Sequence, residues 1–153
     1  ISSLARVDLA VELENQVQKS IQMGAKLIVG GIRKDSFFEP TILTEVTTKM
    51  PVFREETFGP LAAIITFKTI DEAIELSNQS EFGLGVSIFT QDIDFIKTRI
   101  SAFNEGAVFI NEMVKSDPKL PFGGIKKSGY GRELSEEGIK EFVNVKTVVI
   151  NRL

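Results

Sequence analysis

The chain has 153 residues, of which 42% are hydrophobic and 25% charged, values that fit one globular domain and exclude a disordered or fibrous protein. Its net charge is −3 and no apolar run is long enough to span a bilayer, so we expect no nucleic-acid partner, no membrane and a cytoplasmic location. It has no cysteine and no histidine, which excludes thiol nucleophiles, Ser-His-Asp relays and ordinary zinc sites.

The first predicted element is an amphipathic helix over residues 8–23. Apolar residues recur there at every fourth position, and Gly24 follows where a helix would end. The apolar stripe consists of Leu9, Leu13, Val17 and Ile21.

Strands are predicted after this helix. Residues 26–29 form a short apolar run ended by two glycines, and residues 37–43 form a second run whose Pro40 indicates an edge strand. Residues 61–67 are continuously apolar, so we expect them to form a central strand that is buried on both faces.

Helices and strands then alternate. The sequence from Thr69 to Glu72 has the form of a capping box and predicts a helix that runs to about residue 78. Residues 84–89 and 107–110 are apolar runs of strand length, and Asp92 begins a further helix between them. The apolar face of that helix carries Ile93, Ile96, Ile100 and Phe103.

This alternation predicts an α/β fold with an open, largely parallel, twisted sheet that is covered by helices. Residues 111–132 have no periodicity and form a long loop with several glycines, which is typical of a functional loop. A helix near residues 135–142 and a strand rich in β-branched residues near 145–150 complete the chain.

The glycines of the long loop do not complete a phosphate-binding motif. A dinucleotide-binding G-x-G-x-x-G fails because Leu134 stands where the third glycine belongs, and a phosphate loop fails because Lys126 replaces its second glycine. On spacing alone these glycines are turn residues that need positive φ. Glu55-Glu56 is either a solvated pair of carboxylates or a ribose-binding site at a strand edge, and Phe58 by default is a core residue.

Four blocks of the sequence resemble the aldehyde dehydrogenase superfamily in their order and spacing. They are Glu55-Glu56-Thr57-Phe58-Gly59-Pro60, Phe82-Gly83-Leu84, Phe109-Ile110-Asn111, and Pro121-Phe122-Gly123-Gly124 with Ser128-Gly129-Tyr130-Gly131-Arg132-Glu133. Within that family the chain is most similar to succinate-semialdehyde dehydrogenases, through Glu56-Thr57-Phe58 and the loop of residues 111–121. The resemblance implies the C-terminal part of the catalytic domain over residues 1–144 and an oligomerisation strand over residues 145–153.

The resemblance also implies roles for individual residues, taken position by position. Glu56 matches a glutamate that hydrogen-bonds the ribose beside the nicotinamide, while Phe58 and Leu84 match residues that contact the nicotinamide ring. Phe122 matches an aromatic wall of the aldehyde tunnel. Ser116 matches a serine that binds the far carboxylate of a semialdehyde.

In the family, the cysteine nucleophile, the general-base glutamate and the dinucleotide-binding half all precede the segment resembled here, so we expect no catalytic residue in this chain. The resemblance implies part of an enzyme that oxidises an aldehyde, such as succinate semialdehyde, to a carboxylate with NAD or NADP. The isolated chain is expected to be inactive, and to form a homo-oligomer through its terminal strand. The alternative is a non-catalytic α/β module that only folds or associates.

Overall fold

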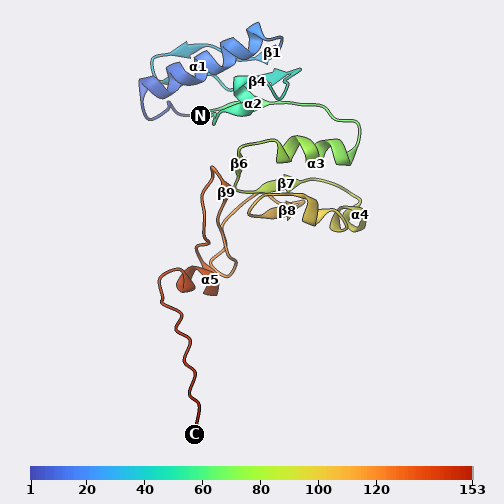
Figure 1. Cartoon of the computed structure of the whole chain (residues 1–153). Coiled ribbons are helices and arrows are strands. Elements are labelled where there is room, and N and C mark those ends of the chain that lie inside the picture. The colour runs from blue at the N-terminus through green and yellow to red at the C-terminus, as the bar shows by residue number, and fades with distance from the viewer. Residues whose placement is uncertain (153) are drawn as a thin grey trace. The chain divides into compact units, whose positions relative to one another are not determined.

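The computed structural model describes residues 1–152, which form two compact units (Figure 1). The first unit consists of residues 1–80, and the second begins at residue 81. The boundary predicted between residues 144 and 145 stays a prediction. Leu153, the last residue of the predicted terminal strand, lies outside the described residues.

A long amphipathic helix, α1 (Val7–Gln22), covers the core of the first unit. Its buried face includes Leu13 and Val17, as the four-residue spacing predicts. Gly24 follows the helix with a φ of 109°, and its N–H donates to the carbonyl of Ile21. Because glycine adopts this backbone conformation at little cost, it ends the helix where the sequence predicted.

The sheet of the first unit contains β1 (Lys26–Val29), β4 (Thr41–Thr44) and β5 (Leu61–Ala63). β4 lies in the middle, antiparallel to β1 and parallel to β5. The strand predicted over residues 26–29 is therefore confirmed.

The single edge strand predicted over residues 37–43 is wrong. Pro40 divides it into β3 (Phe37–Phe38), which pairs with β2 (Arg33–Lys34), and the central strand β4. Because proline has no N–H to donate, the ladder restarts at Thr41, whose N–H donates over 2.9 Å to the carbonyl just before β5. Pro40 thus marks a break between two strands.

The central, doubly buried strand predicted over residues 61–67 is also wrong. Only Leu61–Ala63 is a strand, and it lies at an edge of its sheet. Ala62, Ala63 and Ile64 are exposed, because no other strand of residues 1–152 pairs with the far side of β5. An apolar run predicts that a surface is to be covered, but not which segment covers it.

The core of the first unit forms between α1, the sheet and the turn that follows β4. Phe38, Leu43 and Met50 are its large, fully buried side chains. A single helical turn, α2 (Pro51–Arg54), packs against α1. Pro51 stands at its first position, where the missing N–H costs nothing.

The last helix of the first unit is α3 (Ile70–Asn78), as predicted. The N–H of Glu72 donates to the Thr69 hydroxyl over 3.2 Å. The Glu72 carboxylate accepts in return from the N–H of Lys68 over 2.7 Å. This reciprocal pair of bonds satisfies N–H groups that a helix start leaves open.

Paired strands form the centre of the second unit. β7 (Val86–Ile88) and β8 (Val108–Ile110) are parallel, which confirms the strands predicted over residues 84–89 and 107–110. β6 (Phe82–Gly83) and β9 (Ile125–Lys126) are antiparallel. Across both units, the fold is α/β, but the described residues form separate small sheets with more antiparallel than parallel pairings instead of one largely parallel sheet.

The helix predicted from Asp92 is shorter than its apolar face suggests. Asp92 accepts from the N–H of Phe95 over 3.0 Å and begins α4 (Ile93–Lys97). The Thr98 hydroxyl then donates to the Phe95 carbonyl over 2.7 Å. A short 3-10 turn, η1 (Ile100–Ala102), replaces the predicted continuation of the helix.

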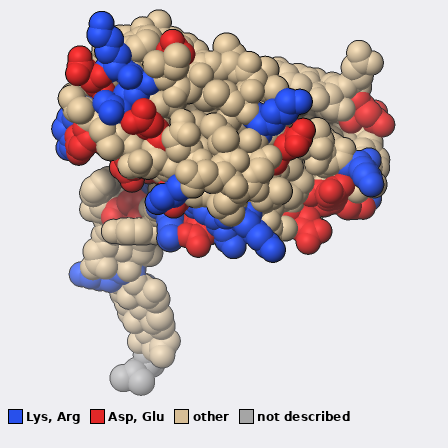
Figure 2. Space-filling model, turned by 90° about the horizontal axis from the view of Figure 1, so that it is seen from above, with Lys and Arg blue, Asp and Glu red and all other residues tan. Residues whose placement is uncertain are grey.

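The chain ends after a short helix, α5 (Ser135–Lys140), which confirms the helix predicted near residues 135–142. Residues 144–152 are neither helix nor strand, and their apolar side chains are exposed. Among residues 1–152, no helix has the length and apolar character that crossing a membrane requires. Basic and acidic side chains are interspersed on the face shown in Figure 2.

Candidate functional site

The candidate site in the first unit is the segment Glu55–Pro60, which directly follows α2. The side-chain amide of Gln16, on α1, donates to the Glu55 carboxylate over 3.0 Å and to the Glu56 carbonyl over 3.3 Å. At the other end, a Cβ on Gly59 would lie 2.5 Å from a methyl carbon of Leu13. The segment is therefore held against α1 at both ends.

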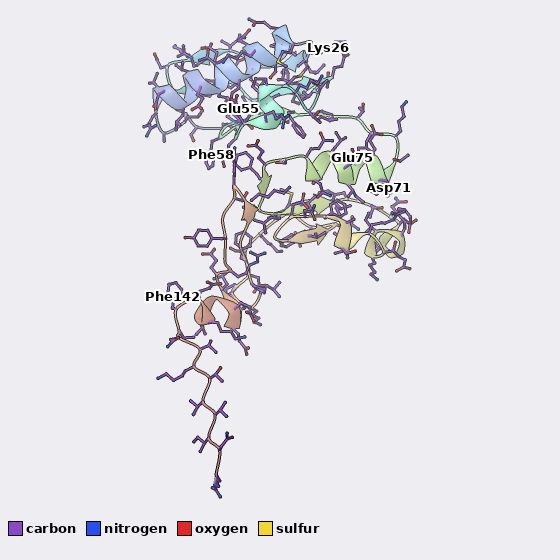
Figure 3. The ribbon with its side chains drawn as sticks, viewed as in Figure 1. Lys26, Glu55, Phe58, Asp71, Glu75 and Phe142 are labelled. Atoms are coloured by element: carbon purple, nitrogen blue, oxygen red, sulfur yellow. The ribbon has the colours of Figure 1, made fainter. Side chains whose placement is uncertain are left out.

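The predicted cofactor residues of this segment are both exposed. Phe58 is 78% exposed, and its ring points away from α1 (Figure 3). Glu56 is exposed as well, and its carboxylate accepts no hydrogen bond from residues 1–152. Such a carboxylate can accept hydrogen bonds from two hydroxyl groups. An exposed aromatic ring offers a flat apolar face. Phe58 is thus no core residue.

Leu84 and Phe122 come together in the second unit, although they lie far apart in the sequence. Both border a hollow of about 390 Å³, together with Arg132 and Tyr130. Gly106 permits this arrangement, because a Cβ there would lie 1.8 Å from the Gly123 carbonyl oxygen and 3.1 Å from that of Leu84. The backbone beside Phe122 and the backbone of Leu84 therefore both pack against Gly106.

Backbone and side-chain bonds close the glycine-bearing loop. Phe122 and Glu133 exchange N–H to carbonyl bonds of 2.9 and 2.8 Å. Arg132 donates to the carbonyls of Gly124 and Gly131 over 3.2 and 2.6 Å. The Ser128 hydroxyl accepts from the N–H of Gly83 over 3.0 Å, which ties the loop to β6.

Ser116 lines neither that hollow nor the second cavity that the structure shows in this unit. A second cavity, of about 470 Å³, is bordered by Phe122, Glu112, Lys115 and Asp117, so both sequence neighbours of Ser116 face it while Ser116 itself is exposed. The loop is fixed on one side of Ser116, where the Val114 N–H donates to the Ser87 hydroxyl over 3.0 Å. On the other side, the Ser135 N–H donates to the Pro118 carbonyl over 3.1 Å.

The cavity beside Lys115 carries both signs of charge. The Lys115 ammonium donates to the Glu112 carboxylate over 3.0 Å. This bond, with a further one from the Met113 N–H, holds the pKa of the Glu112 carboxyl below its ordinary value. Because its pKa is lowered, the Glu112 carboxyl stays ionised to a more acidic pH than an unperturbed glutamate, and the ion pair persists to that pH. Residues 1–152 contain no cluster of carboxylates arranged to hold a metal ion.

The structure therefore groups four of the five predicted residues into two pairs. Glu56 and Phe58 share one anchored segment of the first unit, and Leu84 and Phe122 border one hollow of the second. Sequence reasoning missed Gln16, which holds Glu55 and Glu56. A signal was present, since Gln16 is a polar residue on the apolar face of a predicted amphipathic helix.

Comparisons with known proteins agree on one family. The sequence model described as the aldehyde dehydrogenase family matches residues 2–148. An NAD(P)+ succinate semialdehyde dehydrogenase of Escherichia coli is 45% identical over 100% of this chain. A probable NADP+ succinate-semialdehyde dehydrogenase of Synechocystis is 46% identical over 98% of the chain.

Solved structures agree with the sequence comparisons. The crystal structure of succinic semialdehyde dehydrogenase from Streptococcus pyogenes, in complex with NADP+, matches 98% of this chain with a TM-score of 0.90 and 37% identity. The chain covers 34% of that structure and 34% of each of the two curated relatives. It thus spans about a third of the length of the proteins that it matches.

Proposed function

Because the chain belongs to the aldehyde dehydrogenase family, we propose that it forms the part of an NAD(P)-dependent aldehyde dehydrogenase that contacts the nicotinamide end of the cofactor and the aldehyde. The observation that carries the proposal is that the free carboxylate of Glu56 and the exposed ring of Phe58 belong to one segment anchored to α1. Since the 153 residues contain no cysteine, the nucleophile of this reaction must come from residues outside them.

The residues present fit a nicotinamide dinucleotide. The Glu56 carboxylate would accept hydrogen bonds from the ribose hydroxyls, because both of its oxygens are free of partners among residues 1–152. Phe58 would offer its exposed ring to the nicotinamide. Leu84 is exposed as well and is proposed, by the family resemblance, as an apolar contact to the cofactor. The cofactor, when bound, supplies the hydride acceptor. The role of this chain is then to hold the nicotinamide ring in one orientation for hydride transfer.

We propose succinate semialdehyde as the aldehyde, as in the relatives named above. Phe122 would form an apolar wall of the aldehyde path, and Ser116 would donate its hydroxyl to the far carboxylate. Lys115, which precedes Ser116, borders the same cavity as Phe122, but its charge is paired with Glu112, so the proposal rests on Ser116 and Phe122. We further propose a homo-oligomer, in which residues 145–150 pair with a sheet of a second copy.

The proposed function is tested by supplying the reaction components directly. The 153 residues are produced together with their natural neighbouring sequence, and this protein is called the longer protein. It is mixed with an aldehyde and with NAD or NADP, and the absorbance of the reduced cofactor is recorded. We expect faster reduction with succinate semialdehyde than with butyraldehyde, an uncharged aldehyde of the same length. The 153-residue chain alone should reduce neither cofactor. Reduction by the chain alone, or none by the longer protein with any aldehyde, would contradict the proposal.

A further inference from the structure

Gln16 is a buried polar residue whose side chain reaches out of α1 to a single segment. It is 4% exposed and lies between the core residues Leu13 and Val17. A buried amide destabilises the fold unless its groups are hydrogen-bonded. Its Nε2 atom donates to the Glu55 carboxylate over 3.0 Å and to the Glu56 carbonyl over 3.3 Å. Gln16 therefore makes its contacts on both sides of the peptide bond that leads into Glu56.

The neighbours of Gln16 on the same helix face hold the adjoining backbone. Leu13, one turn before it, lies so close to Gly59 that a Cβ there would be 2.5 Å away. Ser20, one turn after it, accepts from the N–H of Val52 over 3.3 Å and donates to the Gln16 carbonyl over 2.8 Å. Because residues three and four apart share a helix face, these side chains form one continuous support.

We propose that Gln16 is a positioning residue that sets the direction of the Glu56 carboxylate; this inference rests on the proposed function of Glu56. Gln16 fixes both the Glu56 carbonyl and the preceding side chain, while the Glu56 side chain itself is exposed. Preorganisation of this kind lowers the entropy lost when a ligand binds. Without Gln16, the segment would keep its anchor at Leu13 and lose the one beside Glu56.

The direct test is Gln16→Met in the longer protein, because methionine has a similar volume and no N–H to donate. Because the segment loses its anchor beside Glu56, we expect the Kd for NADPH or NADH to rise about tenfold, which corresponds to about 1.4 kcal/mol. The KM for the aldehyde should change less than about twofold, since the aldehyde does not contact this segment in the proposed function. The matched control is Gln18→Met, at an exposed glutamine of the same helix, which should leave both values unchanged.

A second pair of variants separates this contact from a general effect on packing. Gln16→Glu places a carboxylate against Glu55 and should weaken cofactor binding at least as much as Gln16→Met. Adding Glu55→Gln to Gln16→Glu restores a donor and an acceptor in the reverse order, so part of the lost affinity should return. Residues coupled by a direct contact show such non-additivity, whereas independent sites do not.

The outcomes distinguish this inference from the proposed function. If Glu56→Gln weakens cofactor binding and the Gln16 variants do not, Gln16 has no positioning role while the function of Glu56 stands. If Glu56→Gln also has no effect, the proposed function itself is wrong. A Gln16→Met protein that does not fold, by circular dichroism, would overturn the inference too, because the inference limits Gln16 to one local segment. Equal losses for the single and double variants would do the same.

Discussion

At the residue scale, the molecule leaves uncovered the side chains that the family resemblance marks for binding. Phe58 exposes 78% of its surface, although burying so large an apolar ring would stabilise the fold. Glu56, two positions earlier, is exposed without a partner among residues 1–152. The segment thus offers an apolar ring and a free carboxylate, the two kinds of group that small-molecule sites combine.

Ser116 allows a test of the substrate class. In the longer protein, Ser116→Ala should lower kcat/KM for succinate semialdehyde more than for butyraldehyde, because only the former loses a hydrogen bond to a carboxylate, of roughly 1.5 to 3 kcal/mol. Ser101→Ala, at an exposed serine of η1, serves as the control and should change neither value. Equal losses for both aldehydes in the Ser116 variant would remove the support for a carboxylate-bearing substrate.

At the element scale, backbone segments of the second unit pack so closely at Gly106 that no side chain fits there. Gly106 lies against the Gly123 backbone, and its N–H donates to the Gly83 carbonyl over 3.0 Å. An added Cβ would meet two carbonyl oxygens, neither of which can move without its backbone. The position of Phe122 relative to Leu84 therefore depends on this glycine.

Gly106→Ala should separate the two segments. We expect a loss of stability of about 1 to 3 kcal/mol or more in urea unfolding, and faster amide exchange at Phe122. Gly24→Ala is the comparison, because nothing lies within 4 Å of its added Cβ and only its φ of 109° opposes the change. Its loss should be smaller and should leave exchange at Phe122 unaltered. Similar effects of both variants would contradict the role of Gly106 in this close packing.

Local sequence signals predicted two helices well, because a helix forms from local contacts, although α4 is shorter than its apolar face suggested. The stripe from Leu9 to Ile21 and the cap at Thr69 both gave elements with nearly the predicted bounds. The position of a strand within a sheet is set by distant partners, which explains why residues 61–63 lie at an edge and residues 41–44 at the centre. Gln16 was missed for the same reason, since its partners lie 39 and 40 positions away.

At the scale of the whole molecule, residues 145–150 are apolar and rich in β-branched residues, yet unpaired. Val145, Val149 and Ile150 are each about four-fifths exposed, at 83%, 78% and 82%. Backbone groups of an unpaired apolar segment favour addition to another sheet edge. This surface supports the proposed association between copies.

Association through residues 145–150 can be tested by measuring the size of the oligomer. Truncation after Asn144 should abolish the oligomer and leave the helices and paired strands folded, as judged by light scattering and circular dichroism. A finer test compares Val148→Pro, which removes a backbone donor, with Val148→Thr, which keeps the β-branched shape. Only the proline variant should weaken association. A monomer at micromolar concentration for the unaltered protein would exclude this role for the segment.

The central claim is that this chain positions a nicotinamide cofactor for hydride transfer, and single-turnover kinetics of Glu56→Gln test it most directly. Excess longer protein is mixed rapidly with cofactor and succinate semialdehyde, and formation of the reduced cofactor is followed. An amide offers one acceptor oxygen where a carboxylate offers two, so hydride transfer should slow roughly tenfold, whereas Glu75→Gln, at an exposed glutamate of α3, should not change it. A Glu56→Gln rate equal to that of the unaltered protein would contradict the claim.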